Sequence, residues 1–226
     1  MSDTSKLRLP LLLTFNGGYV DTAGFLALQG LFVAHVTGNF VTLGAAVIQG
    51  GSGIAVKLLA LPVFCCAVIS FRWIVSHFKT SHPLPAALAA QGVLLALACA
   101  LAIQFQSVTD TDDLRLIGFG LVLVVSMAIQ NAAHRLYLAW APPSTLMTGT
   151  TTQVMIDLAD LLQGCPVETH EVTKARFRSL GAAVLCFAAG CGVAALAYFW
   201  LNRWCFALPP VTALAASVLA AKMDRK

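Results

Sequence analysis

Six apolar runs, each long enough to cross a bilayer as a helix, constrain this chain more than any other feature. They are 7–29, 54–76, 84–105, 114–136, 179–201 and 204–221. About 20 helical residues span the roughly 30 Å of hydrocarbon. Hydrophobic residues make up 58% of the 226 residues and charged residues only 11%, against about 25% charged in a soluble domain. Because the mean hydropathy is also high, +0.82, we predict an all-α polytopic membrane helix bundle forming a single domain over residues 1–226.

A polar triplet that contains glycine interrupts an apolar segment twice. The first lies in GLFVAHVTGNFVTLGAAV at 30–47, and the second lies in STLMTGTTTQVMIDLADLL at 144–162. Backbone that leaves the helix inside a bilayer is tolerated only where protein or a water-filled cavity surrounds it. The triplets are therefore candidate substrate-binding residues. They are Thr37, Gly38, Asn39, Thr148, Gly149 and Thr150.

Length arithmetic gives each interrupted segment a re-entrant path. From Gly30, about six extended residues at ~3.3 Å each carry the chain ~20 Å inward. From Asn39 to Gly50, about twelve helical residues at ~1.5 Å each bring it ~18 Å back. We therefore expect two re-entrant half-helices besides six full spans. Each half-helix should begin near the midplane, with Thr and Asn side chains capping its first turn.

The same order of segments occurs twice along the chain. A span, a triplet segment and two further spans account for residues 7–105 and again for 114–221, and Thr148 lies 111 residues after Thr37 (148 − 37 = 111). Each half contains three full spans, so the second half enters the membrane from the opposite side. The sequence therefore predicts an inverted repeat, which is typical of secondary transporters.

The basic residues predict how the bundle is oriented. With six spans and the N-terminus inside, all of the fourteen Lys and Arg except Lys57, Arg115 and Arg203 fall on the cytoplasmic side, as the positive-inside rule requires. We expect both termini in the cytoplasm and the lipid bilayer as the surroundings. The cations are scattered over short loops rather than gathered on one face, so nucleic-acid binding is not expected.

Two triplets at matching places favour a binding site. Helix N-termini carry partial positive charge and free N–H groups, so two that converge at the midplane suit a small anion or a polar solute. The structural alternative is that Thr hydroxyls bond to the preceding turn and glycines allow close packing.

Other polar residues lie inside the predicted spans. Asp21 is a candidate proton carrier or cation partner; alternatively it caps a helix broken at Gly17-Gly18 or bonds a neighbouring helix. Gln130 and Asn131 occupy the matching region of the second half, where they face the same cavity or join helices. Asp157, in the second half-helix, is a further proton-coupling candidate.

No catalytic or metal-binding residues emerge from the spacing. There is no recognisable nucleophile–base pair and no histidine pair at the i, i+4 spacing of zinc ligands, so we expect no cofactor and no metal. The leading prediction is a small secondary transporter or permease. A membrane-embedded enzyme and a non-transporting assembly protein are the alternatives. A homodimer is an option because 226 residues are few for a lone transporter.

Both triplet regions resemble those of the YoaK family, small bacterial inner-membrane proteins that share a domain of unknown function. The resemblance rests on GGYVDTAGFLAL and GLFVAHVTGNFVTLG in the first half, and on MAIQNAAHRL and STLMTGTTTQVMIDLADLL in the second. It extends more weakly over nearly the whole chain. It implies a multi-spanning protein of the bacterial inner membrane, and it implies no particular activity or substrate.

Overall fold

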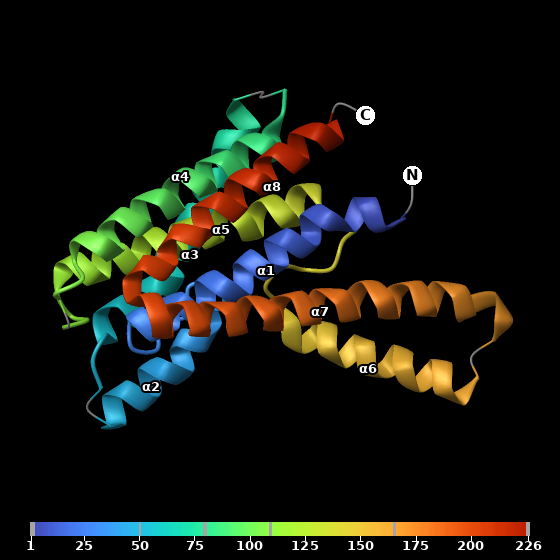
Figure 1. The fold of residues 1–226 in the computed structure, drawn as a ribbon, viewed down its shortest axis with the longest axis horizontal. Helices are drawn as coiled ribbons and strands as arrows, with labels where there is room; N and C mark the ends of the chain where they lie inside the picture. The colour runs from blue at the N-terminus through green and yellow to red at the C-terminus, as the bar shows by residue number, and fades with distance from the viewer. Residues whose placement is uncertain (1–2, 50, 79–80, 109, 165, 225–226) are drawn as a thin grey trace.

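The computed structural model describes residues 3–49, 51–78, 81–108, 110–164 and 166–224, and every regular element in those ranges is a helix (Figure 1). The α-helices are α1 (Asp3–Ala27), α2 (Asn39–Gln49), α3 (Ile54–His77), α4 (Pro83–Gln104), α5 (Leu114–Tyr137), α6 (Met147–Gln163), α7 (Val167–Leu201) and α8 (Leu208–Asp224). Short 3-10 helices, η1 (Val36–Gly38) and η2 (Asn202–Ala207), precede α2 and α8. The all-α prediction is confirmed.

Each apolar run of the sequence falls mainly in one of six helices: α1, α3, α4, α5, α7 and α8. Two predicted starts are wrong: α7 begins at Val167 rather than at 179, and α8 begins at Leu208 because residues 204–207 belong to η2. Four stretches are long and apolar enough to cross a membrane, namely α3, α4, α5 and Glu168–Met223, which covers α7 and α8. These helices also expose large apolar side chains, such as Ile69 on α3 and Phe199 on α7. Exposed apolar faces of this length belong against lipid, so the chain is a membrane-embedded helical protein.

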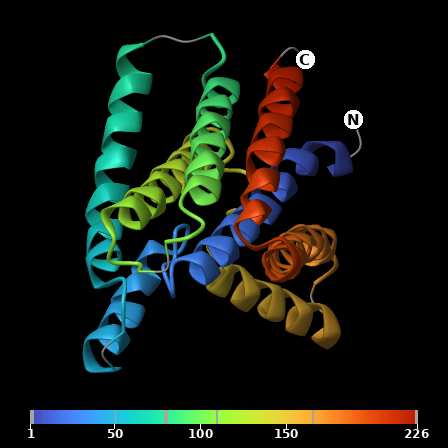
Figure 2. The ribbon, with the colours of Figure 1, turned by 60° about the vertical axis from the view of Figure 1, so that its left-hand side comes forward.

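The helices pack in a bundle that α7 crosses obliquely: Figure 2 shows α7 end-on, with α3, α4 and α8 seen from the side. α1 lies against α7 and α8, α4 lies against α5 and α8, and α3 lies against α5. In both views the two ends of the described chain and the end of α3 lie at one end of the bundle. The connections that follow α2 and α4 lie toward the other end.

Two glycines allow α1 and α7 to cross at very short range. A Cβ added to Gly18 would lie 2.3 Å from the carbonyl oxygen of Phe187, and one added to Gly190 would lie 2.2 Å from that of Phe15. Small residues permit such close backbone approach between membrane helices. α1 is helical through Gly17 and Gly18, so the expectation of a broken helix there is wrong.

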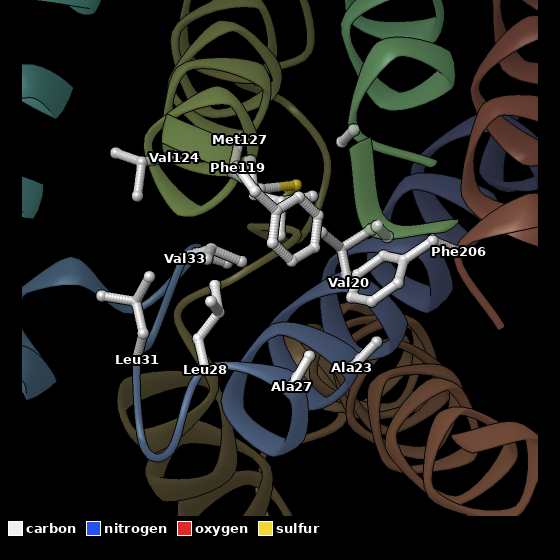
Figure 3. Close-up of a cluster of buried hydrophobic side chains, with 14 of the residues drawn as sticks. Val20, Ala23, Ala27, Leu28, Leu31, Val33, Phe119, Val124, Met127 and Phe206 are labelled. Atoms are coloured by element: carbon white, nitrogen blue, oxygen red, sulfur yellow. The ribbon is translucent and has the colours of Figure 1, made fainter. Parts of the chain in front are cut away.

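Between α1 and α2 the chain folds back into the bundle, and we name residues 28–38 the fold-back segment. The chain reverses at Gln29 and Gly30, whose φ angles are 48° and 94°, the left-handed region that glycine adopts without strain. Figure 3 shows the apolar side chains of this segment packed against those of α1 and α5. The packed side chains include Val20, Ala27, Leu28, Leu31, Val33, Phe119, Val124 and Met127.

α2 and α6 are the helices that begin at the two triplets. α2 begins at Asn39, as predicted, and packs on α3, whereas α6 begins at Met147 and packs on α7. α2 ends at Gln49; the expected last residue, Gly50, lies outside the described residues. In both views α2 and α6 begin near the middle of the molecule and diverge from there (Figures 1 and 2).

The predicted helix caps are wrong in both halves. Asn39 directs its side chain back to Phe32 rather than to the first turn of α2. α6 has no side-chain cap, because Leu146 occupies the N-cap position. Thr150 instead donates its hydroxyl to the carbonyl of Leu146 (2.7 Å), which is the bond to the preceding turn that the structural alternative describes.

The three basic residues that depart from the positive-inside pattern each hold a connection in place. Lys57 donates its ammonium group to a carbonyl between α2 and α3 (3.0 Å). Arg203 donates to two carbonyls between α4 and α5. Arg115 pairs with Asp113 (2.6 Å) and lowers the pKa of that carboxyl to about 2. These cations therefore have local partners that explain their position.

Replacing Gly190 with alanine should destabilise the protein. The new methyl group would meet the backbone carbonyl of Phe15, and overpacking of this kind costs about 1–3 kcal/mol of unfolding free energy. Gly192→Ala is the matched control, because no atom lies within 4 Å of its added Cβ. Thermal unfolding of both variants in detergent measures the difference, and equal midpoints would contradict the close crossing of α1 and α7.

Candidate functional site

Asp21, on α1, organises the fold-back segment. Its Oδ1 accepts hydrogen bonds from the backbone N–H groups of Val33 (2.8 Å) and Ala34 (2.7 Å). Its Oδ2 lies 2.7 Å from Nδ1 of His35. The residue is only 5% exposed. The carboxylate therefore satisfies backbone donors that have no helical partner, as buried N–H groups require.

Asn39 closes the same segment from its other end. Its side-chain oxygen accepts the N–H of Phe32 (2.8 Å) and its side-chain nitrogen donates to the carbonyl of Phe32 (2.7 Å). The amide thus pairs with both backbone groups of one residue, using one donor and one acceptor. Asn39 is buried and does not line the cavity described next, so its role is to hold the segment.

An open cavity of about 540 Å³ lies between α1, η1 and α7, and Phe25, Leu26 and Thr37 of its lining are exposed at the protein surface. Asp21 and His35 line it together with Thr37 and Gly38 of the first triplet. The side chain of His35 is 30% exposed; its Nδ1 contacts Asp21, and no other described residue bonds its second ring nitrogen, Nε2. The remaining lining residues are Thr22, Phe25, Leu26, Phe32, Phe187 and Cys191. Cavities of this size hold small ligands.

Gln130 joins helices and does not face the cavity. Its side-chain oxygen accepts from Asn16 (3.0 Å) and Gln91 (2.7 Å), and its nitrogen donates to the carbonyl of Leu13 (2.9 Å) and to the hydroxyl of Ser144 (3.2 Å). All its hydrogen-bonding positions are used, and the residue is fully buried. Gln130 therefore acts as the interhelical contact that the sequence left as one of two options.

Asn131 bonds the segment that precedes α6. Its side-chain oxygen accepts the hydroxyl of Thr145 (2.6 Å), and its nitrogen donates to the carbonyl of Met127 in its own helix (3.0 Å). Asp21 makes the corresponding connection in the first half, from a helix to the segment before a short helix. Neither amide of the second half lines the Asp21 cavity.

The second triplet lies apart from this cavity. Thr148 lines a groove on the outer face of α6, whose other lining residues also come from α6. Gly149 is exposed, and Thr150 is buried with its hydroxyl bonded inside the chain. Of the six triplet residues, the structure brings only Thr37 and Gly38 into the Asp21 cavity.

Asp157 pairs with a cation from the neighbouring helix. Nη2 of Arg176 lies 2.6 Å from Oδ1 of Asp157, Nε of Arg176 lies 2.9 Å from Oδ2, and Gln153 adds a third donor (2.8 Å). The Asp157 side chain is 0% exposed. Two-pronged pairs of this type are strong and geometrically specific, so Asp157 joins α6 to α7 and lies outside the cavity.

His35 belongs to the candidate site, but sequence reasoning did not select it. It follows Asp21 by 14 residues, which corresponds to no shared helix face. The reversal at Gln29 and Gly30 brings the two side chains together. The available signal was a histidine in an interrupted apolar segment directly after a helix with a buried acid.

Replacing Asn39 with alanine should loosen the fold-back segment. Both backbone groups of Phe32 would lose their partner, and an unpaired buried group costs about 1–3 kcal/mol. We expect a lower melting temperature and faster amide hydrogen exchange over residues 28–38. Thr148→Ala, at an exposed position of the second triplet, should leave both unchanged. Equal exchange in the two variants would contradict the role of Asn39.

Comparison with known proteins agrees with this architecture. The family model described as "Protein of unknown function (DUF1275)" matches residues 9–219. The chain is 30% identical over 159 residues to the UPF0700 transmembrane protein YoaK of Bacillus subtilis (strain 168), covering 67% of this chain and 66%, slightly less than two thirds, of that protein. No solved structure matches. The resemblance to the YoaK family is confirmed, and the chain is an integral membrane protein that belongs to the DUF1275 family.

Proposed function

We propose that this protein is a small secondary transporter or permease for a polar solute, with its site in the Asp21 cavity. One observation carries the proposal: a buried carboxylate, a histidine whose Nε2 no described residue bonds, and part of a polar triplet line one cavity of a membrane-embedded bundle. Ionisable groups inside a membrane protein commonly mark substrate or proton pathways. Transporter sites are commonly built where helices are interrupted near the midplane.

Helix packing supports an inverted repeat of two three-span halves, 7–105 and 114–221. Counterpart helices are α1 and α5, α2 and α6, α3 and α7, and α4 and α8. If each helix is replaced by its counterpart, every packed pair should become another packed pair. The pair α1–α7 becomes α5–α3, the pair α2–α3 becomes α6–α7, and the pair α4–α5 becomes α8–α1. All six pairs are in contact. The pairs α4–α8 and α1–α5 map onto themselves and also pack. A duplicated unit accounts for this correspondence.

The environment of the fold-back segment supports a re-entrant path. Apolar side chains of the segment pack into the core beside α1 and α5, and the backbone groups of three of its residues bond to Asp21 and Asn39. Such satisfaction by protein is the condition for irregular backbone at membrane depth. Together with α2 and α6 as half-helices, this gives the arrangement of six spans and two re-entrant segments.

The positions of the connections support both termini in the cytoplasm. The ends of the described chain lie at the same end of the bundle as the end of α3, whereas the α2–α3 and α4–α5 connections lie toward the opposite end (Figures 1 and 2). Placing the first group inside puts the basic residues near both ends of the chain and near the end of α3, such as Arg8, Arg72 and Lys222, on the cytoplasmic side, in agreement with the positive-inside rule.

Within this proposal, Asp21 and His35 together carry the coupled proton. Asp21 holds the imidazole through Nδ1, which leaves Nε2 free to take a proton from the cavity, as a histidine held by a carboxylate can. Asp157 is less suited to this role because Arg176 occupies its carboxylate.

A membrane enzyme is the second candidate, since Cys191 lines the cavity with Asp21 and His35. A cysteine nucleophile needs its base within hydrogen-bonding reach. The Cys191 thiol contacts the carbonyl of Gly18 (3.4 Å), and no bond joins it to His35 in the described structure. Transport therefore accounts for the geometry better than nucleophilic catalysis.

A cysteine at Thr37 tests alternating access without knowledge of the substrate. With the seven native cysteines replaced by serine, Thr37→Cys should react with a membrane-impermeant thiosulfonate from either face of sealed vesicles. A transporter exposes its central site to each side in turn, whereas a static assembly protein does not.

The matched control is Ser126→Cys in the same background. Ser126 is fully buried in α5 and lines neither the Asp21 cavity nor the groove on α6. It should therefore stay unlabelled from both faces. Reaction of Thr37→Cys from one face only, over repeated measurements between pH 5 and pH 8, would exclude alternating access and the proposed function with it.

Single cysteines in the loops test the six-span topology. Ser52→Cys and Asp110→Cys should label from outside intact cells, and Ser81→Cys should label only after the membrane is opened. Asp110 is preferred to the adjacent Thr111 because Thr111 is only 1% exposed. Labelling of Ser52→Cys from the cytoplasmic side would mean that the first triplet segment crosses the membrane completely.

A further inference from the structure

Aromatic rings form the walls of the Asp21 cavity. The centroids of Phe25 and Phe32 lie 4.9 Å apart, those of Phe32 and His35 lie 6.3 Å apart, and those of His35 and Phe187 lie 5.5 Å apart. Successive rings are inclined by 50°, 72° and 86°. All four residues line the cavity, so rings from α1, the fold-back segment and α7 border one space at differing angles.

The polar groups of the cavity are negative or accepting. Asp21 supplies a carboxylate. Because Nδ1 of His35 points at that carboxylate (2.7 Å), the proton of the neutral ring belongs on Nδ1, and Nε2 then presents a lone pair. Thr22 and Thr37 add hydroxyl groups, and among the residues that the structure describes no Lys or Arg lines the cavity.

We propose that this cavity binds a small organic cation, such as an alkylammonium or quaternary ammonium group. The inference rests on the proposed transport function and specifies its substrate class. A cation is attracted to the faces of aromatic rings and to a carboxylate nearby. An anion would meet the Asp21 carboxylate with no basic side chain in the lining to offset the repulsion. The lining thus favours a cation over the anion that converging helix ends suggested.

A proton on His35 competes with the cation. The titratable groups that line the cavity around His35 are Asp21 of α1 and Cys191 of α7, and η1 contributes none. Protonation of His35 neutralises the charge of Asp21 and adds a like charge beside the ligand, which disfavours binding. Cation affinity should therefore be lower when His35 carries a second proton than when its ring is neutral. This competition would couple cation movement to proton movement in the opposite direction.

The test uses choline and its uncharged isostere 3,3-dimethylbutan-1-ol as probes of purified protein in detergent. At pH 8 we expect choline to bind about tenfold more tightly than the alcohol, in keeping with the attraction of a desolvated cation to aromatic rings, and to raise the melting temperature. Equal affinity for the two probes, or tighter binding of benzoate than of choline, would overturn the proposal.

Phe187→Leu isolates the contribution of one ring. It keeps apolar volume on α7 and removes the aromatic face, so choline should bind about fivefold more weakly while the alcohol is unaffected. Phe199→Leu is the matched control, because Phe199 is exposed on the same helix and lies outside the cavity. Unchanged choline affinity in Phe187→Leu would contradict the aromatic site.

His35→Gln tests the competition with protons. Lowering the pH should weaken choline binding to the wild-type protein more than binding to His35→Gln, which has no ring to protonate. Equal pH dependence in the two proteins would contradict the role of His35. Asp21→Asn is less useful alone, since Asp21 also holds the fold-back segment.

The two experiments can reject the proposed substrate class and the proposed transport function independently of each other. If choline binds as expected and Thr37→Cys labels from one face only, the cation site stands and alternating access is excluded. If Thr37→Cys labels from both faces and the alcohol binds as well as choline, transport stands and the substrate is not a cation.

Discussion

The fold-back segment depends on one interaction, the acceptance of the Val33 and Ala34 backbone N–H groups by the Asp21 carboxylate. Val33 and Ala34 are buried, and a buried donor that is left unpaired costs about 1–3 kcal/mol. With the donors bound, the chain can leave α1, enter the bundle and begin α2. His35 follows these donors directly, so the bonds that hold the backbone also direct an imidazole toward the cavity.

The second half meets the same structural demand with neutral groups. Asn131 accepts a hydrogen bond from the hydroxyl of Thr145, which precedes α6. The side-chain amide of Gln130 forms hydrogen bonds that connect α1, α4, α5 and the segment between α5 and α6. Such bonds stabilise a membrane bundle without placing charge in it. The segments that precede α2 and α6 are thus held by different groups, and of these two segments only the first brings a carboxylate and a histidine together. That difference is why the proposed site lies in one half.

The close crossing of α1 and α7 also forms part of the site. A Cβ on Gly18 would meet both the Phe187 carbonyl and the Cys191 sulfur, and the side chains of Phe187 and Cys191 line the cavity. The distance between the two helices thus sets the position of one cavity wall. The helix crossing and the shape of the cavity are consequently linked here, because close-packed protein interiors transmit small displacements.

Hydropathy and chain length by themselves determined the helical class, the limits of α3, α4 and α5 to within one residue and the start of α2 at Asn39, because these depend on local apolar patterns and on the width of a bilayer. They did not determine the start of α7 at Val167, because its first turns carry polar and charged residues. Depth in an apolar run also identified Asp21. Only the tertiary structure decided the partner of each polar side chain: Asp21 with His35, Asn39 with Phe32, Asp157 with Arg176. It also separated the two triplets. Such pairings depend on the direction in which the chain leaves a turn, and sequence spacing does not encode that direction.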